Sequence, residues 1–207
     1  MFGPNRCRVI AYIDGFNLYS GLAEDGHGDL RWLDLAALTK SFLRNRDEFV
    51  QAKYFTTRVK FNPSRARQST YLDALNACGG VEIHEGNFLE EDFKCRAGCG
   101  RPFKQYREKK TDVHLAAQLV ADAFSDRFDR AIIVSGDTDQ VPGIQIVRKQ
   151  VGKEVGVAFP PLRVHHELKT TASFWLNINR NHLRQSQLPN RIQKSNGIVI
   201  RKPPEWS

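Results

Sequence analysis

Long apolar runs are missing from this chain of 207 residues. No run approaches the roughly 18 residues that a membrane-spanning helix needs, so we expect no membrane segment. The first six residues, MFGPNR, also lack the apolar core of a signal peptide. We therefore expect a cytoplasmic protein.

Cysteine is scarce as well, with 4 residues in the chain. In a cytoplasmic protein so few cysteines favour free thiols or a metal site over disulfides. A chain of this length buries about 70% of its unfolded surface on folding, so it needs no disulfide framework. With 41% hydrophobic and 26% charged residues it is neither disordered nor a coiled coil. Its length fits one domain of roughly 100–200 residues.

The formal charge of +8 is distributed unevenly along the chain. Residues 94–110 carry 7 basic and 1 acidic side chains, and residues 161–207 carry 8 and 2, whereas the remaining parts are slightly acidic. Local basic patches favour a polyanionic partner such as nucleic acid. A solvated basic face that keeps the protein soluble is the alternative.

Short apolar runs alternate with longer amphipathic stretches. We expect strands at residues 9–13, 49–56, 81–84, 131–134 and 155–159. We expect helices at residues 34–43, 63–78, 111–123 and 141–150, the second of them capped by Asn62 with Pro63 as its first residue. This alternation predicts an α/β fold, a three-layer α/β/α sandwich with a mostly parallel central sheet.

Acidic residues follow the two clearest strands. Asp14 ends the first strand, and Asp137 and Asp139 lie in the turn after residues 131–134. Ligands of open parallel sheets bind at the carboxyl ends of the strands, where strand order reverses. Asp112, in the first turn of a later helix, could approach from the side.

Carboxylates that converge in this way repel one another unless a cation compensates their charge. A group of oxygen ligands without histidine or thiolate suits a hard ion such as Mg²⁺ or Mn²⁺. We therefore predict a metal site at this edge of the sheet. Taken singly, each aspartate also has a structural explanation, in a turn or at the start of a helix.

Three segments carry a resemblance to a known family: residues 13–19 (IDGFNLY), 109–113 (KKTDV) and 134–142 (VSGDTDQVP). In order and spacing they resemble the signature segments of the NYN domain family, PIN-like ribonucleases that include the bacterial LabA-like group. The resemblance covers about residues 8–160. It implies a PIN-like fold in which acidic residues hold Mg²⁺ or Mn²⁺, and in which metal-activated water hydrolyses RNA phosphodiesters.

The resemblance also implies roles for individual residues. Catalytic and metal-binding roles fall to Asp14, Asp112, Asp137 and Asp139, and supporting polar positions fall to Asn17, Ser135 and Thr138. It implies a catalytic domain over residues 1–160, with a basic extension over 161–207 that completes or decorates it. Gln140 departs from the pattern, since the family usually has an apolar or aromatic residue there. The departure bears on packing or substrate contact rather than on the metal ligands.

An insertion over residues 87–107 shows no clean period and contains Cys95 and Cys99. A structural Zn²⁺ takes four ligands. Cys78 and His84, which flank the preceding strand, are the candidates to complete such a site. Because Cys-x₃-Cys is a loose spacing, two free thiols or a redox-formed pair remain the alternative.

Basic and aromatic residues lead from this insertion to Asp112; they are Lys104, Tyr106, Arg107, Lys109 and Lys110. Cations beside stackable rings suit a single-stranded backbone with unstacked bases. We therefore predict that this segment guides RNA, single-stranded or structured, to the metal site. A solvated loop is the alternative.

Two other functions stay open. The first is an RNA-binding or regulatory module with the same fold and little or no hydrolysis. The second is a phosphate-transfer enzyme that acts on small molecules. It is the weaker of the two, because the sequence has no glycine-rich phosphate loop of the Walker type and no Asp-x-Asp after the first strand.

Overall fold

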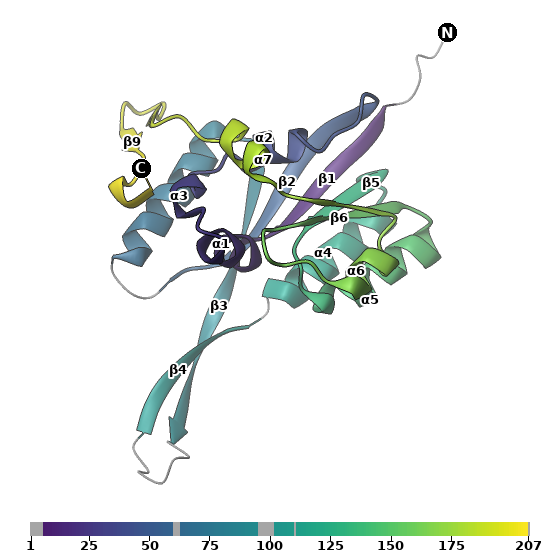
Figure 1. Cartoon of the computed structure of the whole chain (residues 1–207), viewed down its shortest axis with the longest axis horizontal. Helices are drawn as coiled ribbons and strands as arrows, with labels where there is room; N and C mark the ends of the chain where they lie inside the picture. The colour runs from purple at the N-terminus through teal and green to yellow at the C-terminus, as the bar shows by residue number, and fades with distance from the viewer. Residues whose placement is uncertain (1–5, 60–62, 95–101, 110, 207) are drawn as a thin grey trace.

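A central β-sheet organises the molecule in the computed structural model, which describes residues 6–59, 63–94, 102–109 and 111–206, with backbone alone for 87–94 and 102–109 (Figure 1). Within these residues the main sheet has seven strands in the order β4-β3-β2-β1-β5-β6-β7. They are β1 (Cys7–Asp14), β2 (Asp47–Thr57), β3 (Val81–Lys94), β4 (Pro102–Lys109), β5 (Arg130–Val134), β6 (Glu154–Phe159) and β7 (Phe174–Asn177). All neighbours are parallel except β3 and β4.

Helices cover both faces of this sheet (Figure 1). One face carries α1 (Gly15–Glu24), α2 (Leu35–Lys40), α3 (Ser64–Cys78) and α7 (Arg180–Gln185). The other carries α4 (Thr111–Phe124), α5 (Val141–Ile146), the π-helical turn η3 (Val147–Val151) and α6 (His166–Thr171). The predicted three-layer sandwich with a mostly parallel sheet is confirmed.

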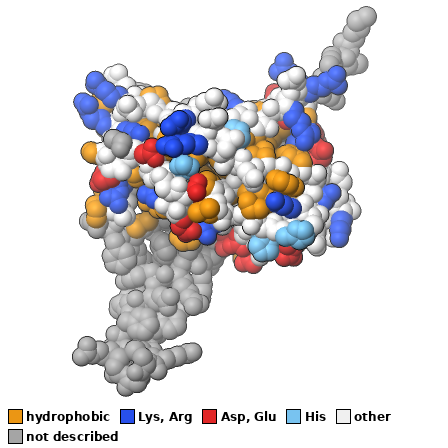
Figure 2. All heavy atoms as spheres, in the orientation of Figure 1, with side chains coloured by type: hydrophobic (Ala, Val, Ile, Leu, Met, Phe, Trp, Pro, Cys, Tyr) orange, Lys and Arg blue, Asp and Glu red, His pale blue; other side chains and the backbone are white. Residues whose placement is uncertain are grey.

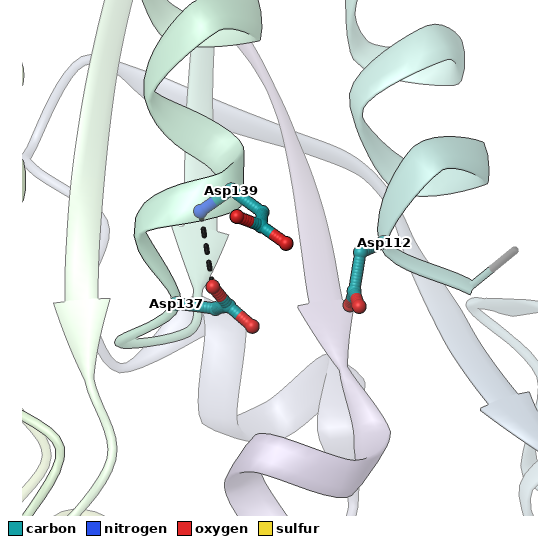
Figure 3. Close-up of side chains that lie close together, drawn as sticks. All are labelled: Asp112, Asp137 and Asp139. Atoms are coloured by element: carbon teal, nitrogen blue, oxygen red, sulfur yellow. Dashed lines mark hydrogen bonds between the residues drawn. The ribbon is translucent and has the colours of Figure 1, made fainter. Parts of the chain in front are cut away.

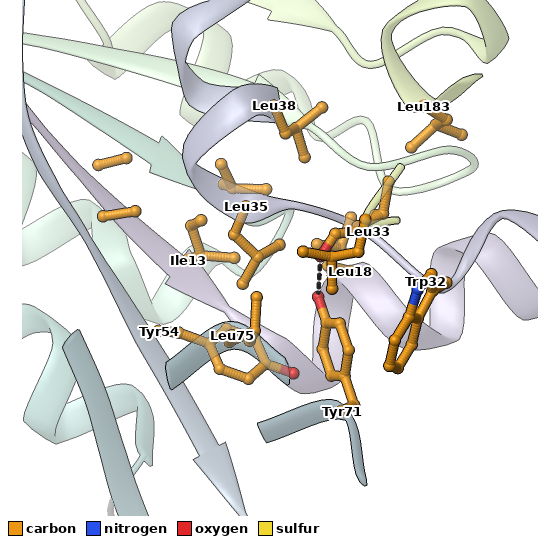
Figure 4. Close-up of a cluster of buried hydrophobic side chains, with 14 of the residues drawn as sticks. Ile13, Leu18, Trp32, Leu33, Leu35, Leu38, Tyr54, Tyr71, Leu75 and Leu183 are labelled. Atoms are coloured by element: carbon orange, nitrogen blue, oxygen red, sulfur yellow. Dashed lines mark hydrogen bonds between the residues drawn. The ribbon is translucent and has the colours of Figure 1, made fainter. Parts of the chain in front are cut away.

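The alternation of side chains along β1 explains why the sheet has two hydrophobic cores. Val9, Ala11 and Ile13 point to the face that α1, α2 and α3 cover, whereas Ile10 and Tyr12 point to the face under α4. All five are fully buried. Figure 4 shows the first core, in which helix leucines pack with a group of aromatic rings.

Some helix boundaries differ from those that the sequence predicts. Pro63 is the N-cap of α3 rather than its first residue, and Asn62 lies outside the described residues. α2 ends at Lys40 because the chain tightens there: Phe42 and Leu43 donate to carbonyls only three residues back. α1, which has no counterpart among the predicted helices, begins directly after Asp14 and is capped by its side chain.

The predicted insertion is a long hairpin that extends from the body of the molecule (Figure 1). β3 pairs with β2 only over residues 81–86 and then continues to Lys94, and β4 returns antiparallel to it. Beyond residue 86, within the described part of the chain, β3 pairs with β4 alone. Because this part of the hairpin does not pack against either core, its sequence needs no alternation of apolar and polar residues. This explains why residues 87–107 show no periodic pattern.

Residues 161–206 pack onto the same two cores. β7 extends the sheet beside β6, and the side chains of Leu168 and Leu183 are buried on opposite faces. The small hairpin of β8 (Arg191–Gln193) and β9 (Val199–Arg201) leads to Trp206, in the turn η4 (Pro204–Trp206). The ring of Trp206 packs against Trp32. Lys and Arg side chains form several separate groups on the described part of the face in Figure 2.

Ion pairs join strands at the amino edge of the sheet, and one of them reaches across β1. Arg130 at the start of β5 bonds to Asp47 at the start of β2 and to Glu154 at the start of β6. Arg8 near the start of β1 bonds to Asp129, with Nη2 2.8 Å from Oδ1. These pairs fix the strands at the edge opposite to Asp14.

Among the described helices, none combines the length and the apolar character that crossing a bilayer would require.

Candidate metal centre

The strand order of the sheet reverses between β1 and β5. The two strands pair directly, with Ile13 beside Val134, and later strands extend the sheet away from this pair in both directions. In open α/β sheets the crevice outside the carboxyl ends at such a point is where ligands bind. Asp14 ends β1 there, and Ser135, Gly136 and Asp137 follow β5.

Three aspartates meet at this point (Figure 3). Asp112 lies in the first turn of α4, Asp137 precedes the turn η2 (Thr138–Gln140), and Asp139 lies within that turn. One carboxylate oxygen from each lies within 4.8 Å of the others. Asp112 and Asp137 are half-buried and Asp139 is exposed, so the group opens to solvent on one side.

Asp14 is not among the three carboxylates whose oxygens lie within 4.8 Å of one another, and its role as a metal ligand stays a prediction. Its carboxylate is buried and accepts hydrogen bonds from the Asn17 backbone N at 2.9 Å and from the Ser135 Oγ at 2.9 Å. The same Ser135 Oγ accepts from the backbone N of Asp137 at 3.0 Å. Among the described residues the structure thus brings together three of the four predicted carboxylates, and Asp14 is linked to them through Ser135.

The loop after β5 is also held from α1. The Asn17 side chain accepts a hydrogen bond from the backbone N of Gly136 at 2.9 Å. Asp137 in turn accepts from the backbone N of Asp139 at 3.0 Å, which fixes the two carboxylates relative to each other. Thr138 lies between them as the first, half-buried residue of η2. Asn17 and Ser135 therefore contact the backbone that presents the aspartates.

The donor set fits a hard divalent cation. All three groups are carboxylates, and a bound cation would offset the repulsion between their like charges. Mg²⁺ and Mn²⁺ prefer oxygen ligands of this kind, and the open side leaves room for water or a substrate oxygen.

A hollow of about 280 Å³ lies at the same edge of the sheet, between α1, the end of β2 and α3. Five aromatic rings line it: Phe16, Tyr19, Tyr54, Tyr71 and Trp206. Thr57, which also lines it, has its Oγ1 3.0 Å from that of Thr111, the residue before Asp112. The sequence carried a signal for this feature, since Phe16 and Tyr19 stand three residues apart directly after Asp14.

Two histidine rings meet where α4 packs on β3: His114 is in the first turn of α4 and His84 is on β3. His84 stacks on Phe55 with ring centroids 4.6 Å apart, and His114 meets His84 edge-on at 5.0 Å. Burial lowers the pKa of His84. Of the predicted zinc ligands, Cys78 is exposed at the end of α3, and Cys95 and Cys99 lie outside the described residues. Zinc at these residues stays a prediction.

The predicted RNA-guiding residues lie on or next to the hairpin. Lys104, Tyr106, Arg107 and Lys109 are on β4, whose backbone alone is described, and Lys110 lies outside the described residues. β4 ends two residues before α4 begins, so this strand leads directly to Asp112. Their contact with RNA stays a prediction.

A buried ionic network lies under the sheet, and the sequence did not predict it. The Nζ of Lys53 is 2.7 Å from the Oδ2 of Asp122, to which the hydroxyl of Tyr12 also donates at 2.7 Å. Lys53 is 3% exposed and Asp122 is 5% exposed. A lysine within the apolar run of β2 was the signal for this pair, because a buried cation requires a partner.

Residues 8–176 match the NYN domain family. The chain belongs to this family. Membership places it in the PIN-like superfamily and suggests nuclease-type function, with nucleic acid as the class of substrate. The match extends past the domain boundary predicted at residue 160 and includes part of β7.

The chain is also similar to 6-hydroxy-3-succinoylpyridine 3-monooxygenase HspA of Pseudomonas putida, with 28% identity over 242 aligned positions. These cover 98% of this chain and 76% of the relative. Among solved structures it is similar to a Vibrio parahaemolyticus protein of unknown function, with a TM-score of 0.57 and 19% identity. That likeness covers 87% of this chain and 98% of the other, and it shows the fold.

Proposed function

We propose that this NYN domain protein is a metal-dependent ribonuclease. The observation that carries the proposal is the group formed by Asp112, Asp137 and Asp139 at the point where strand order reverses. Family membership supplies the class of reaction, and the carboxylates supply the means to hold a cation. Hydrolysis of a phosphodiester adds water across a P–O bond, so it needs no covalent intermediate on the protein.

Each side chain of the centre has a distinct task in this proposal. Asp112, Asp137 and Asp139 would hold Mg²⁺ or Mn²⁺. When bound, such an ion would polarise a phosphoryl oxygen and lower the pKa of a water molecule that it coordinates. Asp14 and Ser135 keep the Asp137 backbone in place, and Asn17 does the same for Gly136. The basic residues of β4 and Lys110 would guide the RNA backbone toward Asp112.

Cleavage of labelled RNA by purified protein tests the proposal. Single-stranded and hairpin RNA are incubated with Mg²⁺ or Mn²⁺ and with EDTA, and wild type is compared with Asp112→Asn and Asp137→Asn. Both variants keep the size of the side chain and remove a charge from the group, so we expect cleavage to fall below detection. Asp73→Asn, an exposed acid on α3, serves as the control and should cleave like wild type.

Two results would contradict the proposal. Cleavage at the wild-type rate by both variants would show that the group does no chemistry. RNA binding that persists in EDTA with a steep salt dependence and no turnover would instead favour an RNA-binding or regulatory module.

The Pseudomonas putida relative suggests a second candidate function, oxidation of a hydroxypyridine acid. The hollow favours it, because aromatic rings and two arginines, Arg31 and Arg67, suit a planar ring that bears a carboxylate. Oxygen consumption on addition of 6-hydroxy-3-succinoylpyridine and a reduced nicotinamide tests this candidate. No consumption, together with metal-dependent RNA cleavage, would exclude it.

A further inference from the structure

The aromatic hollow beside the candidate metal centre has no role in holding a cation. We infer that it is a subsite for one unpaired nucleotide of the RNA strand, whose base stacks on the rings and whose anionic backbone contacts Arg31. The inference rests on the proposed function and specifies how the substrate is recognised.

Two of the rings are placed for a ligand rather than for the core. Phe16 is 66% exposed and Tyr19 is 42% exposed, and they lie three residues apart on the same side of α1. The core-facing side of that helix is formed by Leu18 and Leu22. Large rings left in water beside a hollow mark a binding surface.

The opposite wall is rigid. Tyr71 meets Tyr54 edge-on with centroids 6.2 Å apart and meets Trp206 edge-on at 5.9 Å. Its hydroxyl donates to the backbone O of Leu33 at 2.9 Å, the bond drawn in Figure 4. A base that enters the hollow therefore meets a wall of rings that is fixed in advance.

The charge of the hollow selects an anion. None of the described residues that line it is acidic, and Arg31 and Arg67 are its cations. Arg67 already pairs with Glu205 at 3.1 Å. Arg31 lies over the ring of Tyr19 at 4.2 Å and donates to its hydroxyl, while its buried Nε has no hydrogen-bond partner among the described residues. Arg31 is thus the cation available to a phosphate.

The hollow and the metal centre are joined at two places. Gly15, directly after Asp14, lines the hollow, and Thr57, another lining residue, contacts Thr111, the neighbour of Asp112. A volume of 280 Å³ is just below the range of about 300–1,000 Å³ of pockets that bury small organic ligands. A single base fits this size, and a base must be unpaired to enter the hollow and stack on its rings.

Binding measured without metal tests the inference. Fluorescence anisotropy in EDTA gives the dissociation constants of a labelled oligouridylate and of an equally long abasic oligoribonucleotide. The variants are Phe16→Ala, Tyr19→Ala and Arg31→Gln. The control is Phe124→Ala, which removes a ring that is 63% exposed at the far end of α4.

Loss of either stacking ring should weaken oligouridylate binding by about tenfold, the size of a base–aromatic contact. The abasic strand should bind equally to wild type and to Phe16→Ala, and Phe124→Ala should bind both strands like wild type. Tyr19→Ala also removes the ring and hydroxyl that Arg31 contacts, so it should weaken the abasic strand, but less than oligouridylate. Arg31→Gln should weaken both strands, because both keep the phosphate. Thermal melts establish that the variants fold.

Unchanged oligouridylate binding by Phe16→Ala and Tyr19→Ala would overturn the inference, as would an equal loss for the abasic strand. Binding of a pyridine carboxylate that these variants abolish, with oligonucleotides unaffected, would overturn it in favour of a small aromatic acid. Because no metal is present, these outcomes are independent of the cleavage assay. Base-dependent binding without any RNA cleavage would support the nucleotide subsite but contradict the proposed ribonuclease activity.

Discussion

Asn17 acts on the candidate metal centre without belonging to it. Its side chain accepts from the backbone of Gly136, in the loop that presents Asp137 and Asp139. In Asn17→Ala the loop loses this bond, and we expect Mn²⁺ to bind about 10- to 100-fold more weakly, as when other supporting contacts of metal ligands are removed. Isothermal titration of Mn²⁺ measures the change. Asn76→Ala, at an exposed position of α3, is the control, and equal Mn²⁺ affinity of the two variants would contradict the assigned role.

Asp122 matters for stability rather than for chemistry. It is the partner of the buried Lys53, and the hydroxyl of Tyr12 and the amide of Gln118 also donate to it. These bonds lower the pKa of Asp122 against the opposing effect of its burial. Asp122→Ala leaves the buried lysine with only the half-exposed Glu82, whose Oε2 is 3.7 Å from its Nζ. We therefore expect the free energy of unfolding to fall by about 3–5 kcal/mol.

Urea denaturation of this variant measures that loss. Glu24→Gln, which removes an exposed partner of Arg163, is the matched control and should change the free energy of unfolding much less. A loss of less than about 1 kcal/mol in Asp122→Ala would show that the lysine finds another partner or water.

At the scale of residues, the sequence predicted what depends on strand position. Asp137 and Asp139 follow the clearest apolar run of the chain, so their place at the sheet edge follows from the parallel topology. The bond between Ser135 and Asp14, and the burial of Lys53 beside Asp122, depend on the distance between residues more than 60 positions apart. Periodicity carries no information on such contacts.

The β3–β4 hairpin is the element on which the predicted RNA path depends. β4 is an edge strand and, within the described residues, pairs only with β3. Changing Lys104, Arg107 and Lys109 together to Gln should leave the melting temperature unchanged. We expect the slope of log affinity for single-stranded RNA against log salt to become shallower by about 2, since each phosphate that is no longer neutralised accounts for about 0.7.

Anisotropy titrations between about 50 and 200 mM salt measure this slope. The control carries the same loss of charge elsewhere: Arg180, Arg184 and Arg191, all exposed, are changed to Gln. If the salt-dependence slope of the control becomes as shallow as that of the β4 variant, RNA contacts are spread over the surface. The hairpin then has no special role in RNA binding.

Helices and strands that pack one side against a hydrophobic core could be predicted from the sequence. Elements that extend beyond the cores could not. β5 and α4 carry apolar side chains at the period of their structure, and both were predicted close to their observed bounds. α1 has glycines at positions 15 and 21, which disfavour a helix, and it exposes two aromatic rings. The hairpin lies beyond the cores, and its sequence has no periodic pattern.

At the scale of the whole molecule, the half-buried His84 makes stability depend on pH. Burial lowers the pKa of His84, with Glu82, His114, Lys53 and Asp122 as the charged groups around it. Below the unfolded-state pKa near 6.5 the unfolded chain binds a proton that the folded chain excludes. The free energy of unfolding should therefore decrease as the pH falls from about 7 to 5.

Urea denaturation at a series of pH values checks this decrease. His84→Gln removes the titrating group and should make the dependence shallower, whereas the exposed His165→Gln should keep the wild-type dependence. The same dependence in wild type and His84→Gln would assign the effect to other groups, such as His182, whose pKa burial also lowers.

The amino ends of the strands stabilise the sheet, whereas the carboxyl ends carry the candidate functional site. This separation makes the protein favourable for engineering. Arg130 and Arg8 join strands at one end, and the aspartates, the hollow and the hairpin meet at the other. In a library of single substitutions sorted for abundance and for activity, changes at the first end should lower abundance together with activity. Changes at the second end should lower activity while abundance stays high. Fusion partners, labels or immobilisation points attached near the amino ends of the strands would thus leave the working edge unobstructed.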